Sequence, residues 1–127
     1  MMRSAVRVLF FMLALQVGLA TGACAAPQRI VSLDLCTDWM LARYADHAQV
    51  RALSPLHRQY PVAWIGSHWP VHDGTLEQLV ALKPDLVMAG EYNAPLLRAR
   101  LLALGVRVEV LPLPQSLADI HTYERRV

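Results

Sequence analysis

The sequence predicts an α/β domain built on a parallel four-stranded sheet with flanking helices, and two observations predict it. Short apolar runs bounded by turn residues alternate along the chain with segments whose apolar residues recur every three or four positions. One helix also passes directly into a buried strand through a proline. Strands that alternate with helices form parallel sheets with right-handed connections and helices on both faces. The expected architecture is Rossmann-like.

Residues 75–90 contain the helix-to-strand junction around which the other elements are placed. Thr75 and Gln78 fit a capping box that starts the helix. Pro84 cannot continue the helix and biases the preceding residue out of the helical region. The apolar run 86–89 then reads as a short buried strand, because both faces of a parallel sheet are covered.

The remaining elements follow from the same two patterns. Besides residues 86–89, we expect strands at residues 29–33, 50–53 and 107–111, and helices at residues 35–45, 75–82, 94–104 and from 116 to the end. Residues 54–74 contain three prolines and two glycines and show no sustained period. A loop of this length inside a compact domain is usually functional.

Residues 1–25 read as a secretory signal peptide. Two arginines precede an apolar run over residues 8–15, and residues 23–25 fit the small-x-small rule for cleavage. Lipid attachment at Cys24 is the alternative, although Thr21 stands where such signals usually carry a large aliphatic residue. Either interpretation makes this an exported protein.

The charge balance argues against nucleic acid as a partner. The chain has 12 Lys and Arg against 10 Asp and Glu, and two of the arginines lie in the predicted signal peptide. The mature chain therefore has 12 − 2 = 10 basic side chains against 10 acidic ones. No basic surface for a polyanion is implied.

Several polar residues near the predicted elements are expected to be structural. Asp34 should cap the first helix, and Asp38 should lie on its surface. Arg98 and Arg100 should line a solvated helix face. Cys36, the sole thiol after the signal peptide, is expected to be buried, and the alternative is a reactive thiol at a helix start.

Ligands of parallel α/β sheets bind outside the carboxyl ends of the strands. Aromatic and histidine side chains crowd the 54–74 loop, which follows the second strand, and one tyrosine follows the third. Large flat ligands need broad apolar faces and a few polar anchors, which such side chains supply. The candidates for ligand contact are Trp64, Trp69, Tyr60, Tyr92, His57 and His72. Any one tryptophan could instead pin the loop to the domain.

His68, His72 and Asp73 could together hold a divalent metal ion, with His57 as a further ligand. Solvated loop histidines are commoner than metal-bound ones, so we expect no resident metal, no cofactor and no catalysis. The alternative is a small exported metal-dependent hydrolase that uses these four residues. That alternative lacks a nucleophile and any recognised signature.

Five segments taken together carry a resemblance to a known family. In order and spacing, they resemble the periplasmic substrate-binding proteins of ABC importers for vitamin B12 and iron-siderophore complexes: residues 29–33, 75–78, 82–87, 104–108 and 116–120. The resemblance implies two α/β lobes joined by a long helix, with a metal chelate clamped between them. It assigns residues 26–115 to the N-terminal lobe and residues 116–127 to the start of the connecting helix, with the C-terminal lobe absent.

The resemblance also implies a function. A protein of this kind captures its chelate in the periplasm and delivers it to an ABC permease in the inner membrane. Cobalamin is the first expected cargo and a ferric siderophore the second, while heme and oxyanions fall within the same range. By similarity, Glu77 docks on the permease; the alternative is that it only stabilises the helix start. A third interpretation is an inactive truncated remnant that exposes apolar surface.

Overall fold

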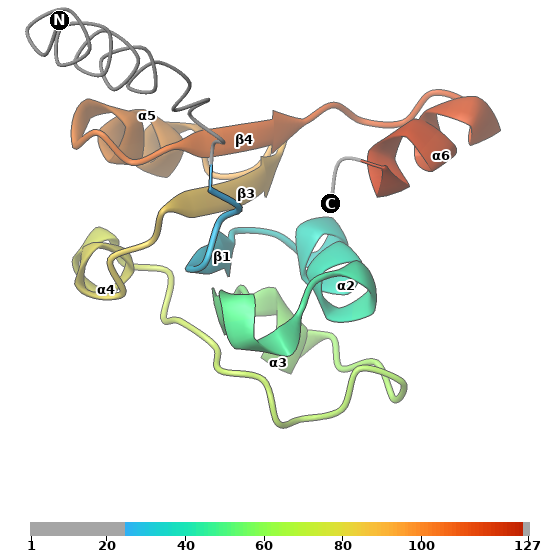
Figure 1. The fold of residues 1–127 in the computed structure, drawn as a ribbon, viewed down its shortest axis with the longest axis horizontal. Helices are drawn as coiled ribbons and strands as arrows, with labels where there is room; N and C mark the ends of the chain where they lie inside the picture. Colours follow the sequence, from blue (N-terminus) through green and yellow to red (C-terminus); the bar gives the residue numbers. More distant parts are fainter. Residues whose placement is uncertain (1–24, 126–127) are drawn as a thin grey trace, which may run out of the picture.

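The structure is a computed structural model, and it describes residues 25–125. The predicted signal peptide lies outside the described residues except for its last one, and Cys24 lies outside them too. The sheet has four parallel strands in the order β2-β1-β3-β4 (Figure 1). Their bounds are β1 Ile30–Ser32, β2 Val50–Ala52, β3 Leu86–Gly90 and β4 Val108–Leu111. The predicted fold class is confirmed.

Four helices occupy the predicted segments: α2 Leu35–Tyr44, α4 Leu76–Ala81, α5 Pro95–Ala103 and α6 Leu117–Glu124. Two short elements were not predicted, namely the 3-10 helix η2 His47–Gln49 and the helix α3 Leu56–Gln59. Each is too short to show an apolar period, and η2 depends on Asp46, whose side chain accepts from the Ala48 N–H at 3.0 Å. No helix in the described part of the chain is long and apolar enough to cross a membrane.

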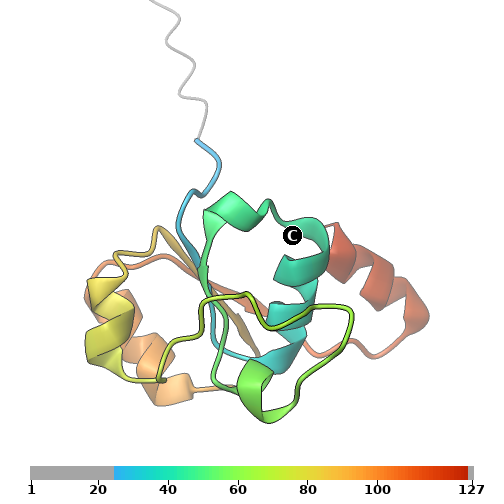
Figure 2. The ribbon, with the colours of Figure 1, turned by 90° about the horizontal axis from the view of Figure 1, so that it is seen from below.

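Helices cover both faces of the sheet. α4 and α5 lie on one face and α2 lies on the other, as Figures 1 and 2 show. α6 lies beside α2, where the Tyr44 hydroxyl donates to Glu124 Oε1 at 2.9 Å. The sheet therefore separates two apolar layers.

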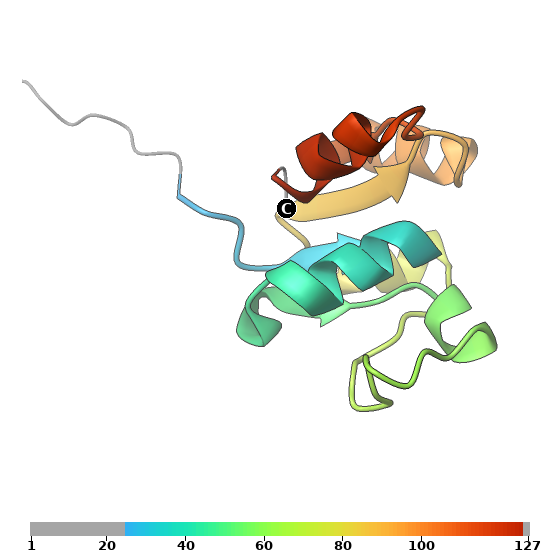
Figure 3. The same cartoon turned by 90° about the vertical axis from the view of Figure 1, so that its right-hand side faces the viewer.

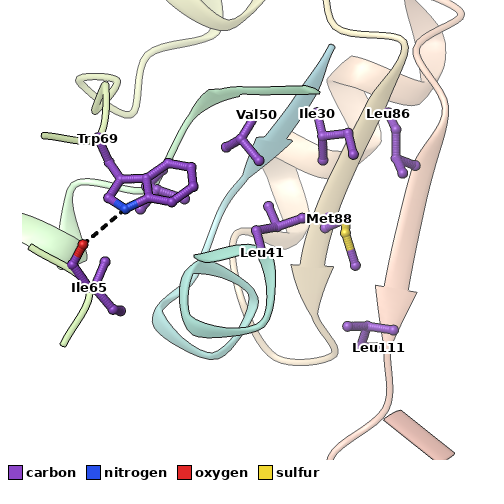
Figure 4. Packing of buried hydrophobic residues seen from close by; sticks show 9 residues of the cluster. Ile30, Leu41, Val50, Ile65, Trp69, Leu86, Met88 and Leu111 are labelled. Carbon is purple, nitrogen blue, oxygen red and sulfur yellow. Dashed lines mark hydrogen bonds between the residues drawn. The ribbon is translucent and has the colours of Figure 1, made fainter. Parts of the chain in front are cut away.

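Successive residues of the strands supply the two layers alternately, because side chains along a strand point to opposite faces. Leu86 and Met88 of β3 pack with Leu41 of α2 (Figure 4). Val87, between them in sequence, packs with Leu79 of α4 on the opposite face. Such strands read as continuous apolar runs, which is why β3 was predictable.

The long loop after β2 folds back beside the carboxyl end of that strand. Its return path pairs with the chain beyond β2 through a parallel bridge between Leu53 and Val71. The Leu53 N–H donates to the Pro70 carbonyl at 2.8 Å, and the His72 N–H donates to the Leu53 carbonyl at 3.1 Å. In Figure 3 the loop lies on the β2 side of the sheet, away from β4. The pairing thereby satisfies backbone groups of Leu53, just beyond the edge strand β2.

Candidate functional site

The strand order makes β1 and β3 neighbours at the point where ligand crevices usually open in such sheets. Asp34 occupies that point. Its carboxylate accepts from the Thr37 N–H at 3.0 Å, which caps α2, and also from the Gly90 N–H at the end of β3. A Cβ on Gly90 would stand 3.0 Å from Asn93 Nδ2 and 3.2 Å from Asp34 Oδ2, so the close approach favours glycine. Asp34 is the predicted cap, and it also ties β1 to β3.

The expectation that Asp38 lies on the surface is wrong. Asp38 is fully buried, and its two oxygens accept from the Ser54 N–H at 2.8 Å and from the Ser54 hydroxyl at 2.6 Å. Burial raises the pKa of Asp38, and hydrogen bonds from Ser32 and Ser54 oppose that rise. The carboxylate joins α2 to the end of β2. The one sequence feature that could have indicated its burial is its position one helical turn after the capping residue Asp34.

His72 is buried at the same end of the sheet. Its Nε2 lies 2.7 Å from the Ser32 carbonyl, and its Nδ1 accepts from the Gly74 N–H at 3.0 Å. These partners require the tautomer in which Nε2 carries the proton. Burial lowers the pKa of His72, so the neutral ring is favoured. Both nitrogens are already bonded, and ligand contact by His72 stays a prediction.

The start of α4 is built by Asp73 and Thr75. Asp73 accepts from the Thr75 N–H at 2.8 Å and from the Thr75 hydroxyl at 2.7 Å, and these bonds lower its pKa. The Thr75 hydroxyl in turn accepts from the Gln78 N–H at 3.3 Å. The Gln78 side chain reaches the Asp73 N–H rather than that of Thr75, so only half of the predicted capping box forms. Glu77, in the first turn, is exposed.

Among residues 25–125, no group of three or more His, Cys, Asp or Glu side chains is placed to hold a metal ion. His68 lies against His47 with 5.3 Å between ring centroids, whereas His72 is bonded to the end of β1. His57 bonds through Nε2 to the Gly66 carbonyl at 3.2 Å. The four residues of the hydrolase alternative therefore do not form one site in the described part of the chain.

The two loop tryptophans have opposite surroundings. Trp69 is only 8% exposed; its indole N–H donates to the Ile65 carbonyl at 3.1 Å, and its ring lies 4.2 Å from that of His47. It belongs to the apolar layer beside α2 (Figure 4). Trp64 is 56% exposed and borders a groove of about 370 Å³ between the loop, α2 and α6. Trp69 thus pins the loop, as the packing alternative supposed.

A larger pocket of about 460 Å³ lies within the loop itself. His57 and Trp69 are the two predicted ligand residues in its lining. The His57 ring is buried, and its Nδ1 has no hydrogen-bond partner among the described residues. The full lining is His57, Arg58, Pro61, Val62, Ala63, Gly66, Ser67, Trp69 and Val71. Arg58 was not singled out from the sequence, because one arginine in a neutral loop gives no signal.

Tyr92 projects from a braced turn after β3 and is 74% exposed. The guanidinium of Arg98 on α5 donates to the Gly90 carbonyl at 3.1 Å and to the Glu91 carbonyl at 2.9 Å. The Glu91 carboxylate accepts from the Leu113 N–H at 3.2 Å, which links this turn to the loop after β4. Arg98 is only partly exposed, because its head holds the turn, whereas Arg100 is exposed as predicted.

The structure gathers only part of the predicted set. His57 and Trp69 share one pocket, and Trp64 borders another groove. Tyr60 and Tyr92 are exposed and line neither. The expectation of a buried Cys36 is also wrong, since the residue is exposed. Partial desolvation, followed by nearby aspartates, raises the pKa of this thiol, which also disfavours the reactive alternative.

No protein-family model matches the chain, and no curated protein matches it. Solved structures do match. A possible iron-binding periplasmic solute-binding protein from Staphylococcus epidermidis is 24% identical with a TM-score of 0.63, over 77% of this chain and 40% of that one. A periplasmic heme-binding protein from Pseudomonas aeruginosa is 25% identical with a TM-score of 0.55, over 76% and 36%.

A periplasmic heme-binding protein from Roseiflexus sp. RS-1, in apo form, is 24% identical with a TM-score of 0.57, over 74% of this chain and 37% of that one. The chain therefore spans about two fifths or less of the length of these structures. The resemblance to periplasmic binding proteins is confirmed at the level of the fold. All three neighbours are described as binding proteins.

Proposed function

We propose that this chain is the N-terminal lobe of the substrate-binding component of an ABC importer. In this role it captures a metal chelate in the periplasm and passes it to a permease in the inner membrane. Cobalamin and ferric siderophores are the cargoes expected from the sequence resemblance. Iron porphyrin joins them, because two of the similar structures are heme-binding proteins.

The observation that carries this proposal is the pocket in the loop after β2. Its volume of about 460 Å³ falls within the range of small-molecule sites. Its lining combines an indole face with several small apolar side chains, which suits a flat, largely apolar ligand. Tyr60 and Trp64 of the same loop are exposed, although neither lines this pocket.

Permease docking through Glu77 is the second part of the proposal. The side chain is exposed in the first turn of α4, where the helix dipole stabilises a carboxylate. Its charge therefore remains available for an intermolecular pair with a basic partner, and such a pair contributes chiefly to orientation and on-rate. Replacing Glu77 by Gln should reduce transport and leave chelate binding unchanged.

The test is titration of the exported protein with cobalamin, iron protoporphyrin IX and a panel of ferric siderophores, followed by tryptophan fluorescence. The pocket-lining Trp69 should be quenched when a chelate enters. Saturable quenching by one chelate would support capture and name the cargo. A folded protein whose fluorescence no chelate changes would contradict the proposal.

A further inference from the structure

The pocket in the loop after β2 has a polar side as well as an apolar one. Five apolar side chains form most of the lining: Pro61, Val62, Ala63, Trp69 and Val71. Among the lining residues that the structure describes, Arg58 is the one side chain that carries a full charge at neutral pH. None of these residues is acidic, so none of them neutralises the guanidinium.

Two further polar groups accompany Arg58. Ser67 lines the pocket and brings a hydroxyl that can donate a hydrogen bond. His57 also lines it, with a side chain that is 5% exposed. Because its Nε2 faces the Gly66 carbonyl, Nε2 carries the proton and Nδ1 is a bare acceptor without a partner among the described residues. As an acceptor, Nδ1 cannot bond a carboxylate oxygen, so the donors that this pocket offers to a carboxylate are the Arg58 guanidinium and the Ser67 hydroxyl.

We propose that this pocket recognises a carboxylate on an otherwise apolar chelate, with Arg58 as the specificity-determining residue. A guanidinium matches a carboxylate with two parallel N–H···O bonds, which no other side chain provides. The pocket is open, so the Arg58 guanidinium stays partly solvated until the ligand arrives. The unpaired charge therefore carries no large desolvation cost in the empty pocket. The inference rests on the proposed function, and it narrows the cargo to chelates with carboxylates at their rim.

The experiment compares iron protoporphyrin IX, which carries two carboxylates, with its dimethyl ester, which has the same apolar ring and none. Both are titrated into the exported protein, followed by Trp fluorescence and by porphyrin absorbance. The variants are Arg58→Gln, Arg58→Lys and the control Arg51→Gln. Arg51 is also exposed and lies in β2, outside the pocket lining.

The unmodified protein should bind the diacid at least tenfold more tightly than the ester. Arg58→Gln should remove that preference by weakening the diacid about tenfold and the ester less than twofold. Arg58→Lys should keep part of the preference for the diacid, because lysine carries the positive charge but cannot donate two parallel hydrogen bonds. Arg51→Gln should change neither affinity. Arg58 is exposed on a four-residue helix, so Arg58→Gln should not unfold the domain, and circular dichroism checks this.

Equal affinity for the diacid and the ester would overturn the inference, as would an Arg58→Gln variant that weakens both alike. In either case a chelate is still bound, so the proposed function survives. Binding only of chelates that carry no free carboxylate, such as cobalamin, would also overturn the inference alone. Only a folded protein that binds no chelate at all would contradict both the inference and the proposed function.

Discussion

The first and second halves of the long loop differ in what they do. Trp64 and Trp69 lie five residues apart in one sequence stretch, yet the first is exposed beside α2 and the second is buried in the core. The same contrast separates Tyr60, which is exposed, from His72, which is bonded to the end of β1. Within residues 60–74, the outward half (60–64) offers aromatic surface, and the inward half (65–74) contributes the buried Ile65, Trp69 and His72.

The difference comes from the bridge between Leu53 and Val71. Residues 70–72 pair with the chain after β2, and this pairing holds Trp69 and His72 against the domain. Residue type does not decide which half a side chain serves. Backbone pairing does, and it depends on contacts between residues far apart in the sequence.

The largest expected effect is on stability at Trp69. Trp69→Ala should lower the free energy of unfolding by about 3–5 kcal/mol, because it opens a cavity and breaks the bond to the Ile65 carbonyl. Trp64→Ala should change it by less than about 0.5 kcal/mol, since the side chain is half exposed. Urea unfolding measures both. Similar losses of unfolding free energy in the two variants would mean that the two halves of the loop contribute equally to stability.

A second test concerns the carboxylate under the loop. Asp38→Ala should cost about 2–3 kcal/mol, because it leaves the Ser54 N–H and hydroxyl buried without a partner. The matched change Asp73→Ala, at an exposed carboxylate of the inward half, should cost much less. Equilibrium unfolding in urea again provides the measurement. An equal loss of unfolding free energy in Asp73→Ala would mean that burial of the carboxylate does not determine how much it stabilises the fold.

The turn that carries Tyr92 gives a smaller effect. Arg98→Ala should lower the free energy of unfolding by about 1 kcal/mol, since two carbonyls lose their donor. Arg100→Ala, at an exposed arginine on the same helix, should cost less than about 0.5 kcal/mol. Thermal unfolding distinguishes them. Equal losses in the two variants would mean that the two hydrogen bonds of Arg98 do not stabilise the protein.

The smallest expected effect depends on pH. Folding lowers the pKa of His72 from 6.5, so the stability that its neutral ring contributes is full above about pH 6.5. That stability is lost as the pH falls through the folded pKa. His72→Gln should therefore show a flatter loss of stability below pH 6.5, whereas His68→Gln, at an exposed ring, should keep the original slope. Asp38 titrates in all three proteins, so comparing slopes removes its contribution.

Much of the fold could be predicted because its signals are local. Thr75 and Pro84 mark the two ends of α4, and the run Leu86–Gly90 reads as a buried strand without knowledge of its neighbours. Lys83 adopts a φ of 49°, outside the right-handed helical region, as its position before proline implied. Helix and strand order then fixed the fold class.

The site was harder because its signals are not local. Asp38 looks like a surface helix residue until Ser54 is placed against it, 16 positions away. Arg98 reads as solvated until the turn after β3 is seen beneath it. Arg58 stands alone in the sequence, and only the folded loop sets it in an apolar pocket. Pairings of this kind depend on tertiary contacts that no short pattern encodes.

The central claim is that the loop pocket holds the chelate, and filling the pocket tests it most directly. Ala63 is exposed and lines the pocket, so Ala63→Phe should occupy the space without disturbing the core. Ala48→Phe, at an exposed alanine of η2 outside the lining, is the control. The account predicts at least a tenfold loss of chelate affinity for Ala63→Phe, with unchanged stability and a normal control. Unchanged affinity in a folded Ala63→Phe protein would contradict it.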